Sequence, residues 1–414
     1  MERAHGRPDL IHDWAAVGPY ELPRPAVAPM LDDETLRDGL HSPSANDPPL
    51  AKKLRLLDIM EGLGIETANL GLPGAGELHR RDILEMCMHL AKSGARLRPN
   101  VACRTVLADI EPVVAMREKT GLDILACCFI GSSPIRQYTE NWTIDTILGH
   151  IEKSLTFARD NGISVMFVTE DTTRAHPDDI RKMYTLAIEL GAQRVCVCDT
   201  VGHATPVGTR NVIRFVKSIV DASGRDVKID WHGHRDRNLD LANCIAAIEA
   251  GAHQIHGAAL GVGERAGNAP MDLLLANFKL LGWIDRDLSS LGDYVKAASE
   301  AIGVPIPHNY PVFGNDAFLT GTGVHAAAVV KALRRGDTWL ADRVYSGVPA
   351  GWFGLEQRIS VGYMSGKSNA EFWLERHGYT PSEGLVKHIL GSAKAGNHLF
   401  TDDELHTLAR SFRP

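Results

Sequence analysis

The chain has 414 residues, 44% of them hydrophobic and 23% charged, with a formal net charge of −7 at pH 7. This composition is ordinary for a globular protein with a large core, and the length predicts more than one domain. An acidic chain is not expected to bind the phosphate backbone of nucleic acids. No apolar run is long enough to predict a membrane-spanning helix, so we expect no membrane partner.

The seven cysteines form no paired Cys-x-x-Cys set, and most of them lie in apolar, strand-like runs. We therefore expect reduced, buried cysteines in a cytoplasmic protein. A reactive pair at Cys196 and Cys198, which share one face of a predicted strand, is the less favoured interpretation, because buried apolar cysteines are usually inert. Residues 1–26 are polar, contain four prolines and no signal-peptide core, and are interpreted as an N-terminal extension.

From about residue 27 onward, short apolar runs alternate with longer helical patterns. The apolar runs predict strands at 27–33, 66–72, 97–103, 123–130, 164–169, 194–198, 228–231 and 253–259. The helical patterns fall near 49–63, 78–93, 109–119, 142–161, 177–191, 207–222, 238–250 and 270–282. Eight strand–helix units of this size predict an α/β fold, a (β/α)8 TIM barrel that forms a catalytic domain over 27–282.

A doubly wound sheet is the competing fold, but it would require a glycine-rich phosphate loop after an early strand, and the sequence has none. After residue 282 the alternation stops. We expect a smaller, mainly helical C-terminal region over 283–414, interrupted by a stretch rich in proline and glycine at 303–314.

Polar residues follow the predicted strands, where the loops of a TIM barrel build the active site. His232 and His234 are two residues apart, so both side chains point the same way and can hold one divalent metal ion. Together with the carboxylate of Asp38 and the amide oxygen of Asn268 they make a mixed nitrogen and oxygen site that suits Zn²⁺, Mn²⁺ or Mg²⁺. The alternatives are two core histidines and, for Asn268, a loop cap.

Such a metal would polarise the carbonyl of a 2-oxo acid. Arg37 is placed to neutralise charge that develops on the carbonyl oxygen. Glu170 and His41 are candidates for proton transfer. The alternatives are an ion pair between Glu170 and Arg174, and a purely steric role for His41.

Several motifs together resemble the DRE-TIM metallolyase superfamily, and within it most closely the 2-isopropylmalate, homocitrate and citramalate synthases. The similarity runs from about Asp32 to Asn369 and includes Thr35–Gly39, Glu170–Arg174, Asp199–Pro206, the His-x-His pair, Gly263–Asn268, Gly314–Phe318, Gly323–His325 and Ser365–Asn369.

The resemblance implies that Asp38, His232, His234 and Asn268 hold the metal, that Arg37 contacts the carbonyl or enolate oxygen, and that Glu170 is the catalytic glutamate. It assigns the substrate carboxylate to Thr200, and it implies that His325 and Tyr345 of the helical tail act across a homodimer. The implied reaction is a Claisen condensation of acetyl-CoA with a 2-oxo acid, which yields a 2-hydroxy diacid and CoA. A C-terminal regulatory domain is expected to be absent.

The sequence departs from those synthases at several positions. Leu40-His41 stands where they usually have Glu-Gln and is similar to lyases of the superfamily, and Arg235 replaces a frequent asparagine. We therefore take Arg104, Arg235 and His41 as further substrate-binding candidates and hypothesise that the acceptor side chain is anionic or otherwise unusual. A metal-dependent lyase acting on 4-hydroxy-2-oxo acids or acyl-CoA esters is the alternative, and a catalytically inactive barrel that serves as a scaffold is the third interpretation.

Overall fold

The computed structural model describes residues 6–7, 9–16 and 24–413. Of the predicted N-terminal extension, residues 1–5, 8 and 17–23 lie outside this description. The contacts divide the chain into two units. The first extends to Arg286 and takes in Asp293–Pro305, and the second contains Asp287–Gly292 and the chain from Ile306 onward.

The first unit is a closed barrel of eight parallel strands in sequential order, which confirms the predicted TIM barrel. The strands are β1 (Met30–Asp33), β2 (Thr67–Asn69), β3 (Arg98–Arg104), β4 (Leu125–Gly131), β5 (Val165–Glu170), β6 (Arg194–Asp199), β7 (Lys228–Gly233) and β8 (Gln254–Gly257). The barrel closes where β1 pairs with β8, which places Asp32 opposite His256.

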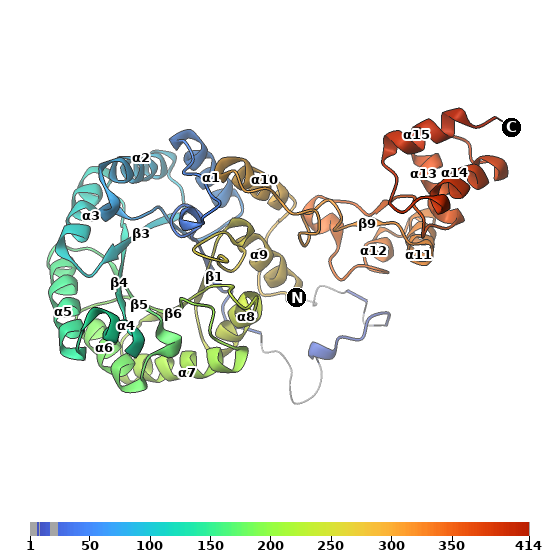
Figure 1. The fold of residues 1–414 in the computed structure, drawn as a ribbon. Coiled ribbons are helices and arrows are strands. Elements are labelled where there is room, and N and C mark those ends of the chain that lie inside the picture. Colours follow the sequence, from blue (N-terminus) through green and yellow to red (C-terminus); the bar gives the residue numbers. More distant parts are fainter. Residues whose placement is uncertain (1–5, 8, 17–23, 414) are drawn as a thin grey trace. The chain divides into compact units, whose positions relative to one another are not determined.

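The helices between the strands lie on the outside of this ring (Figure 1). They are α1 (Leu50–Gly62), α2 (Glu77–Ser93), α3 (Leu107–Thr120), α4 (Pro134–Glu140), α5 (Ile144–Asp160), α6 (Pro177–Glu189), α7 (Pro206–Ser223), α8 (Asp240–Ala250) and α9 (Met271–Leu280). Of these, α4 was not predicted, because its seven residues are too few to show a helical period. The other eight correspond to the predicted patterns.

Local sequence signals explain where the helices begin and end. At the start of α7, the Thr205 hydroxyl accepts a hydrogen bond from the Gly208 N–H, and Pro206 occupies the first turn, where its missing N–H costs nothing. The helix ends at Gly224, which adopts a left-handed conformation with φ of 65°.

The barrel interior contains charged side chains as well as apolar ones. Asp230 on β7 is fully buried and forms an ion pair with Arg194 on β6, with 2.6 Å between the closest atoms. Its other oxygen lies 3.2 Å from Nε2 of His256 on β8. Burial by itself would raise the pKa of Asp230, but Arg194 and His256 together lower it below its ordinary value. These contacts connect three adjacent strands.

The second unit is mainly helical. Besides α10 (Leu291–Ile302), most of which belongs to the barrel unit, its elements are β9 (Leu319–Thr320), α11 (Gly323–Arg334), α12 (Thr338–Ala341), β10 (Arg358–Ile359), α13 (Lys367–Arg376), α14 (Glu383–Ala395) and α15 (Asp402–Ser411). A core around Trp373, Leu374, Ile389 and Leu405 holds its last helices together. No helix in the described part of the chain has the length and apolar character needed to cross a bilayer.

The buried ion pair between Arg194 and Asp230 is expected to contribute to stability. Replacing Arg194 by Met leaves Asp230 buried without its guanidinium partner, so we expect a loss of about 3–5 kcal/mol in the free energy of unfolding. The control is Arg159→Ala, because Arg159 and Asp160 pair on the surface, with 52% and 59% of their side chains exposed. That variant should lose at most about 1 kcal/mol. Urea unfolding followed by tryptophan fluorescence measures both, and equal losses would contradict the prediction.

Candidate active site

A cavity of about 290 Å³ opens at the carboxyl ends of the barrel strands. Residues from all eight strands or from the loops that follow them contribute to its lining. Among them are Arg37, Asp38, His41, Glu170, Thr200, His232 and His234, seven of the candidates chosen from the sequence. The cavity therefore brings together candidates that are far apart in the chain, from Arg37 to His234.

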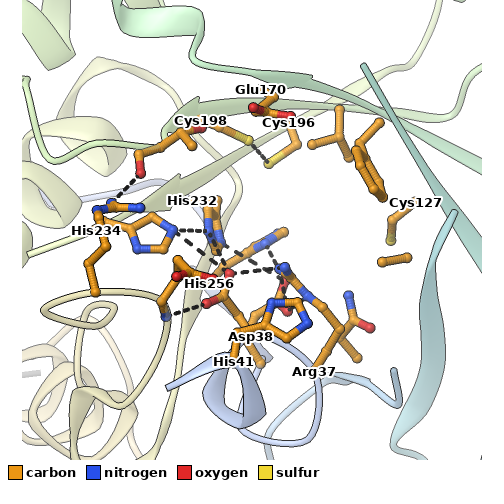
Figure 2. A pocket seen from close by; sticks show the side chains of 18 residues that line it. Arg37, Asp38, His41, Cys127, Glu170, Cys196, Cys198, His232, His234 and His256 are labelled. Carbon is orange, nitrogen blue, oxygen red and sulfur yellow. Dashed lines mark hydrogen bonds and ion pairs between the residues drawn. The ribbon is translucent and has the colours of Figure 1, made fainter. Parts of the chain in front are cut away.

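His232, His234 and Asp38 converge on one point of this cavity (Figure 2). The Nε2 atoms of the two histidines are 3.2 Å apart. Asp38 Oδ2 lies 3.6 Å from His232 Nε2 and 3.8 Å from His234 Nε2. Three ligand atoms of types that divalent metals accept thus face one another, as a shared cation would require.

Asn268 lies beside His234 and carries a buried acceptor, although it is not among the residues that line the cavity. Its backbone forms an isolated antiparallel β-bridge with His234. Its side-chain Nδ2 donates to the carbonyl of Val262. Its Oδ1 is buried and makes no hydrogen bond, which is costly unless a cation or another donor approaches it. A Cβ at Gly263, where φ is 156°, would collide with the Asn268 amide and come within 2.9 Å of Asp38 Oδ1. Glycine at this position therefore lets the loop pack against both residues.

The electrostatics leave these groups in the forms that bind metals. Burial lowers the pKa of His232 to about 3, and burial also lowers the pKa of His234, so both imidazoles are neutral at pH 7. For Asp38, burial opposes ionisation, but Arg37 and the two histidines lower its pKa below the ordinary value. The Glu264 N–H donates to Asp38 Oδ1. The other carboxylate oxygen, Oδ2, faces the two histidines. The residues present therefore fit a divalent cation.

Arg37 is fixed beside this cluster by two carboxylates. Its Nε donates to Glu34 at 2.7 Å, and one terminal nitrogen donates to Asp38 Oδ2 at 2.9 Å. Glu34 in turn lies 3.2 Å from Nδ1 of His256. The guanidinium is therefore held in one orientation at the edge of the cavity.

His256 completes a second group of possible ligands with Glu34 and His232. Burial would lower the pKa of His256, but Asp32, Asp230 and Glu34 raise it well above the ordinary value. A protonated imidazole has no lone pair to offer a metal. The group of Asp38, His232 and His234 is therefore the better metal candidate.

Glu170 lines the cavity at the end of β5, and burial raises the pKa of its carboxyl group although Arg136 opposes the shift. Its ion-pair partner is Arg136, with Nε 3.2 Å from Oε1. The alternative pairing with Arg174 is wrong, because the Arg174 guanidinium binds Asp171 at 2.7 Å.

Thr200 also lines the cavity, and its Oγ1 accepts a hydrogen bond from the N–H of Asp171.

Four other candidates are not among the lining residues: Arg104, Arg235, His325 and Tyr345. The Arg104 guanidinium forms two hydrogen bonds with Asp109, and Arg235 donates to Asn238 at 3.3 Å; neither arginine is among the lining residues. His325 and Tyr345 belong to the second unit, where their rings stack with centroids 4.0 Å apart.

Sequence reasoning did not select several residues of the site. Glu34 and His256 orient Arg37, and Arg265 lines the cavity while its guanidinium binds Asp236. Cys127, Cys196 and Cys198 line it as well. The available signal was the two-residue spacing within strands, which shows that Cys196 and Cys198 face the same side, but it does not say whether that side meets a cavity.

Comparison with known proteins identifies the family of this chain. The HMGL-like family model matches residues 28–295. The chain belongs to the HMGL-like family. The homocitrate synthase of Pyrococcus abyssi is 30% identical over 382 residues, which are 92% of this chain and 99% of that protein. The 2-isopropylmalate synthase of Sulfurisphaera tokodaii is 29% identical over 368 residues, or 87% and 89% of the two chains.

Solved structures of lower sequence similarity share the fold. The HMG-CoA lyase of Brucella melitensis matches with a TM-score of 0.55 at 17% identity, over 66% of this chain and 99% of that one. The hydroxymethylglutaryl-CoA lyase of Pseudomonas aeruginosa gives a TM-score of 0.55 at 19% identity, over 67% and 93%. At these identities the likeness establishes the fold of this HMGL-like chain and says nothing about its reaction.

The geometry predicts tight binding of a divalent ion. The His234→Ala variant removes one of the converging nitrogens, so we expect its affinity for Mn²⁺ to fall by at least about 10–100-fold, the loss that even an outer-shell partner typically causes. Isothermal titration of the metal-stripped protein measures this. The control is His203→Ala, since His203 is exposed and outside the lining. Unchanged Mn²⁺ binding in His234→Ala would contradict the assignment.

Proposed function

We propose that this chain is a divalent-metal-dependent acyltransferase that condenses acetyl-CoA with a 2-oxo acid to give a 2-hydroxy diacid, a 2-substituted malate, and CoA. The observation that carries the proposal is the convergence of Asp38, His232 and His234 beside Arg37, together with the unpartnered oxygen of Asn268. The names of the relatives, homocitrate synthase and 2-isopropylmalate synthase, support this reaction class.

Asp38, His232, His234 and Asn268 would hold the ion, and Mn²⁺, Zn²⁺ and Mg²⁺ all suit this donor set. When bound, such an ion acts as a Lewis acid toward the ketone oxygen of the 2-oxo acid.

The chain's own residues then divide the remaining tasks. Arg37 is held at the cavity edge by Glu34 and Asp38 and directs a guanidinium toward negative charge that develops on the ketone oxygen. Thr200 offers a hydroxyl at the end of β6 for the substrate carboxylate. Glu170 lies on the opposite side and is the candidate that accepts the proton.

The reaction balances with these groups. A base removes one proton from the methyl group of acetyl-CoA, and the resulting enolate carbon attacks the ketone carbon, so that one C–C bond forms and the ketone oxygen takes up a proton. Water then cleaves the thioester, which releases the CoA thiol and a second carboxylate.

We also propose that the protein works as a homodimer in which His325 and Tyr345 of the second unit contribute to catalysis. The stacked rings of these two residues support the idea that they act together.

A lyase is the second candidate, either a 4-hydroxy-2-oxo acid aldolase or an acyl-CoA lyase. The observation that favours it is the position of His41, which lines the cavity next to Asp38 and carries an imidazole able to accept a proton. A lyase would use the same metal ligands in the cleavage direction.

Release of free CoA thiol from acetyl-CoA tests the proposed function. We expect release that requires both a divalent ion and a 2-oxo acid, and that falls by at least about 100-fold in Glu170→Gln, since a positioned base typically contributes 10²–10⁴-fold. No release with any 2-oxo acid, combined with cleavage of a 4-hydroxy-2-oxo acid or an acyl-CoA ester, would favour the lyase.

The burial of Glu170 predicts the pH dependence. A base must be deprotonated, and because burial raises the pKa of Glu170, the acid limb of kcat/KM should have its midpoint above the ordinary glutamate value of about 4.3. Arg136 holds this pKa down, so Arg136→Met should move the limb to higher pH, whereas Arg136→Lys keeps the charge and should move it less. A limb that stays in place in Arg136→Met would count against Glu170 as the base.

A further inference from the structure

The two sides of the cavity differ in chemistry. The candidate metal ligands, Arg37 and His256 come from β7, β8, β1 and the loops that follow them. The opposite side is formed by β3, β4, β5 and β6, and we call its apolar lining residues the apolar wall: Ala102, Cys127, Phe129, Val168, Cys196 and Cys198. Figure 2 shows Cys127, Cys196 and Cys198 across the cavity from Asp38 and Arg37.

The apolar wall is continuous because its strands pair directly. Ala102 lies opposite Cys127, Phe129 opposite Val168, and Val168 opposite Cys196 in the registers of β3 to β6. Cys127, Cys196 and Cys198 also belong to one buried cluster with Met166 below them. The thiols thus form part of a packed surface.

The cysteines of the apolar wall act as small apolar groups. Burial raises the pKa values of Cys127 and Cys196 well above the ordinary thiol value, so both side chains are uncharged. The sulfurs of Cys196 and Cys198 are 3.8 Å apart, within the distance of a weak thiol hydrogen bond. Neutral thiols are soft, polarisable and weak in hydrogen bonding, and they pack well against alkyl groups.

The apolar wall offers no partner for a negative charge. Of the residues of β3 to β6 that line the cavity, none is basic, and the charged one is an acid, Glu170. The two arginines of the lining are engaged elsewhere, Arg37 with Glu34 and Asp38, and Arg265 with Asp236. A carboxylate placed against this surface would be buried without a counter-ion, which is strongly unfavourable.

From this geometry we infer that the acceptor 2-oxo acid carries an uncharged, aliphatic side chain that packs on the apolar wall, an inference that rests on the proposed function and specifies its substrate class. The ketone oxygen faces the metal ligands and Arg37, and the carboxylate faces the Thr200 hydroxyl in the loop after β6. The alkyl side chain then packs on the apolar residues of β3 to β6. The hypothesis of an anionic side chain depended on Arg235 and His41. Arg235 lies outside the lining, and His41 lies on the side of Asp38.

Two pairs of nearly isosteric acceptors test the inference. 2-Oxo-4-methylpentanoate matches oxaloacetate, and 2-oxo-5-methylhexanoate matches 2-oxoglutarate, with a branched alkyl end in place of a carboxylate. We expect kcat/KM for CoA thiol release to be at least about 100-fold higher for the uncharged member of each pair, since several kcal/mol oppose burial of an unpaired ion. Binding is measured separately as the rise in Tm that each acceptor causes in the presence of Mn²⁺ without acetyl-CoA.

A matched pair of variants tests the apolar wall itself. Val168 is half-buried on the apolar wall. Val168→Arg adds a cation there and should reduce the preference for the uncharged acceptors by at least about tenfold, because it gives a carboxylate a partner. Val168→Met has a side chain of similar length without charge and should keep the preference.

The outcomes separate the two proposals. Thiol release that is faster with the charged acceptors overturns the inference and leaves the synthase reaction intact. Absence of release with every acceptor, together with a larger rise in Tm for the uncharged ones, overturns the proposed function and supports the apolar wall as their binding surface. If no acceptor causes CoA thiol release and the uncharged acceptors raise Tm no more than the charged ones, both proposals are overturned.

Discussion

The site depends on one buried charge arrangement, in which the imidazole of His256 on β8 lies between Glu34 and Asp230, 3.2 Å from each. A charge buried in a barrel interior is tolerable only with close partners, and this cation has carboxylates on both sides. Arg37 donates hydrogen bonds to both Glu34 and Asp38, so the position of Glu34 also orients Asp38. Arg194 forms an ion pair with Asp230. The chain of contacts thereby ties the loop after β1 to strands β6 to β8. It sets the position of Asp38 relative to the two histidines before any ligand arrives.

Closure of the barrel then divides the cavity by strand. Because neighbouring strands are parallel and follow the order of the sequence, the ionisable residues of β7, β8 and β1 form one side, and the apolar ends of β3 to β6 form the other. Under the proposed function, one side would bind the carbonyl of the acceptor, and the other would select the side chain attached to it. In a barrel of this kind the chemistry and the choice of substrate are separable, since they depend on different strands and can change independently.

Glu170 lies at the end of β5, on the same side of the cavity as the apolar wall. It is an acid next to apolar residues, its pKa is raised by burial, and Arg136 limits the shift. A carboxylate whose pKa is raised by burial is a stronger base than an ordinary glutamate. No basic residue is among the cavity-lining residues of β3 to β6. A wall with few charges destabilises a carboxylate, which raises the pKa of Glu170, and the same wall accommodates an alkyl side chain.

The sequence by itself determined the barrel. Eight apolar runs and eight helical patterns in alternation admit few arrangements, and the spacing of His232 and His234 follows from the two-residue period of a strand. The sequence could not place Arg104 and Arg235 away from the cavity or pair Glu170 with Arg136, because ion pairs are chosen among many nearby charges by the folded backbone. Nor could it distinguish a cysteine in the packed core from one that faces the cavity. Cys103 and Cys196 are equally buried, and only the closed barrel decides that Cys196 lines the cavity and Cys103 does not.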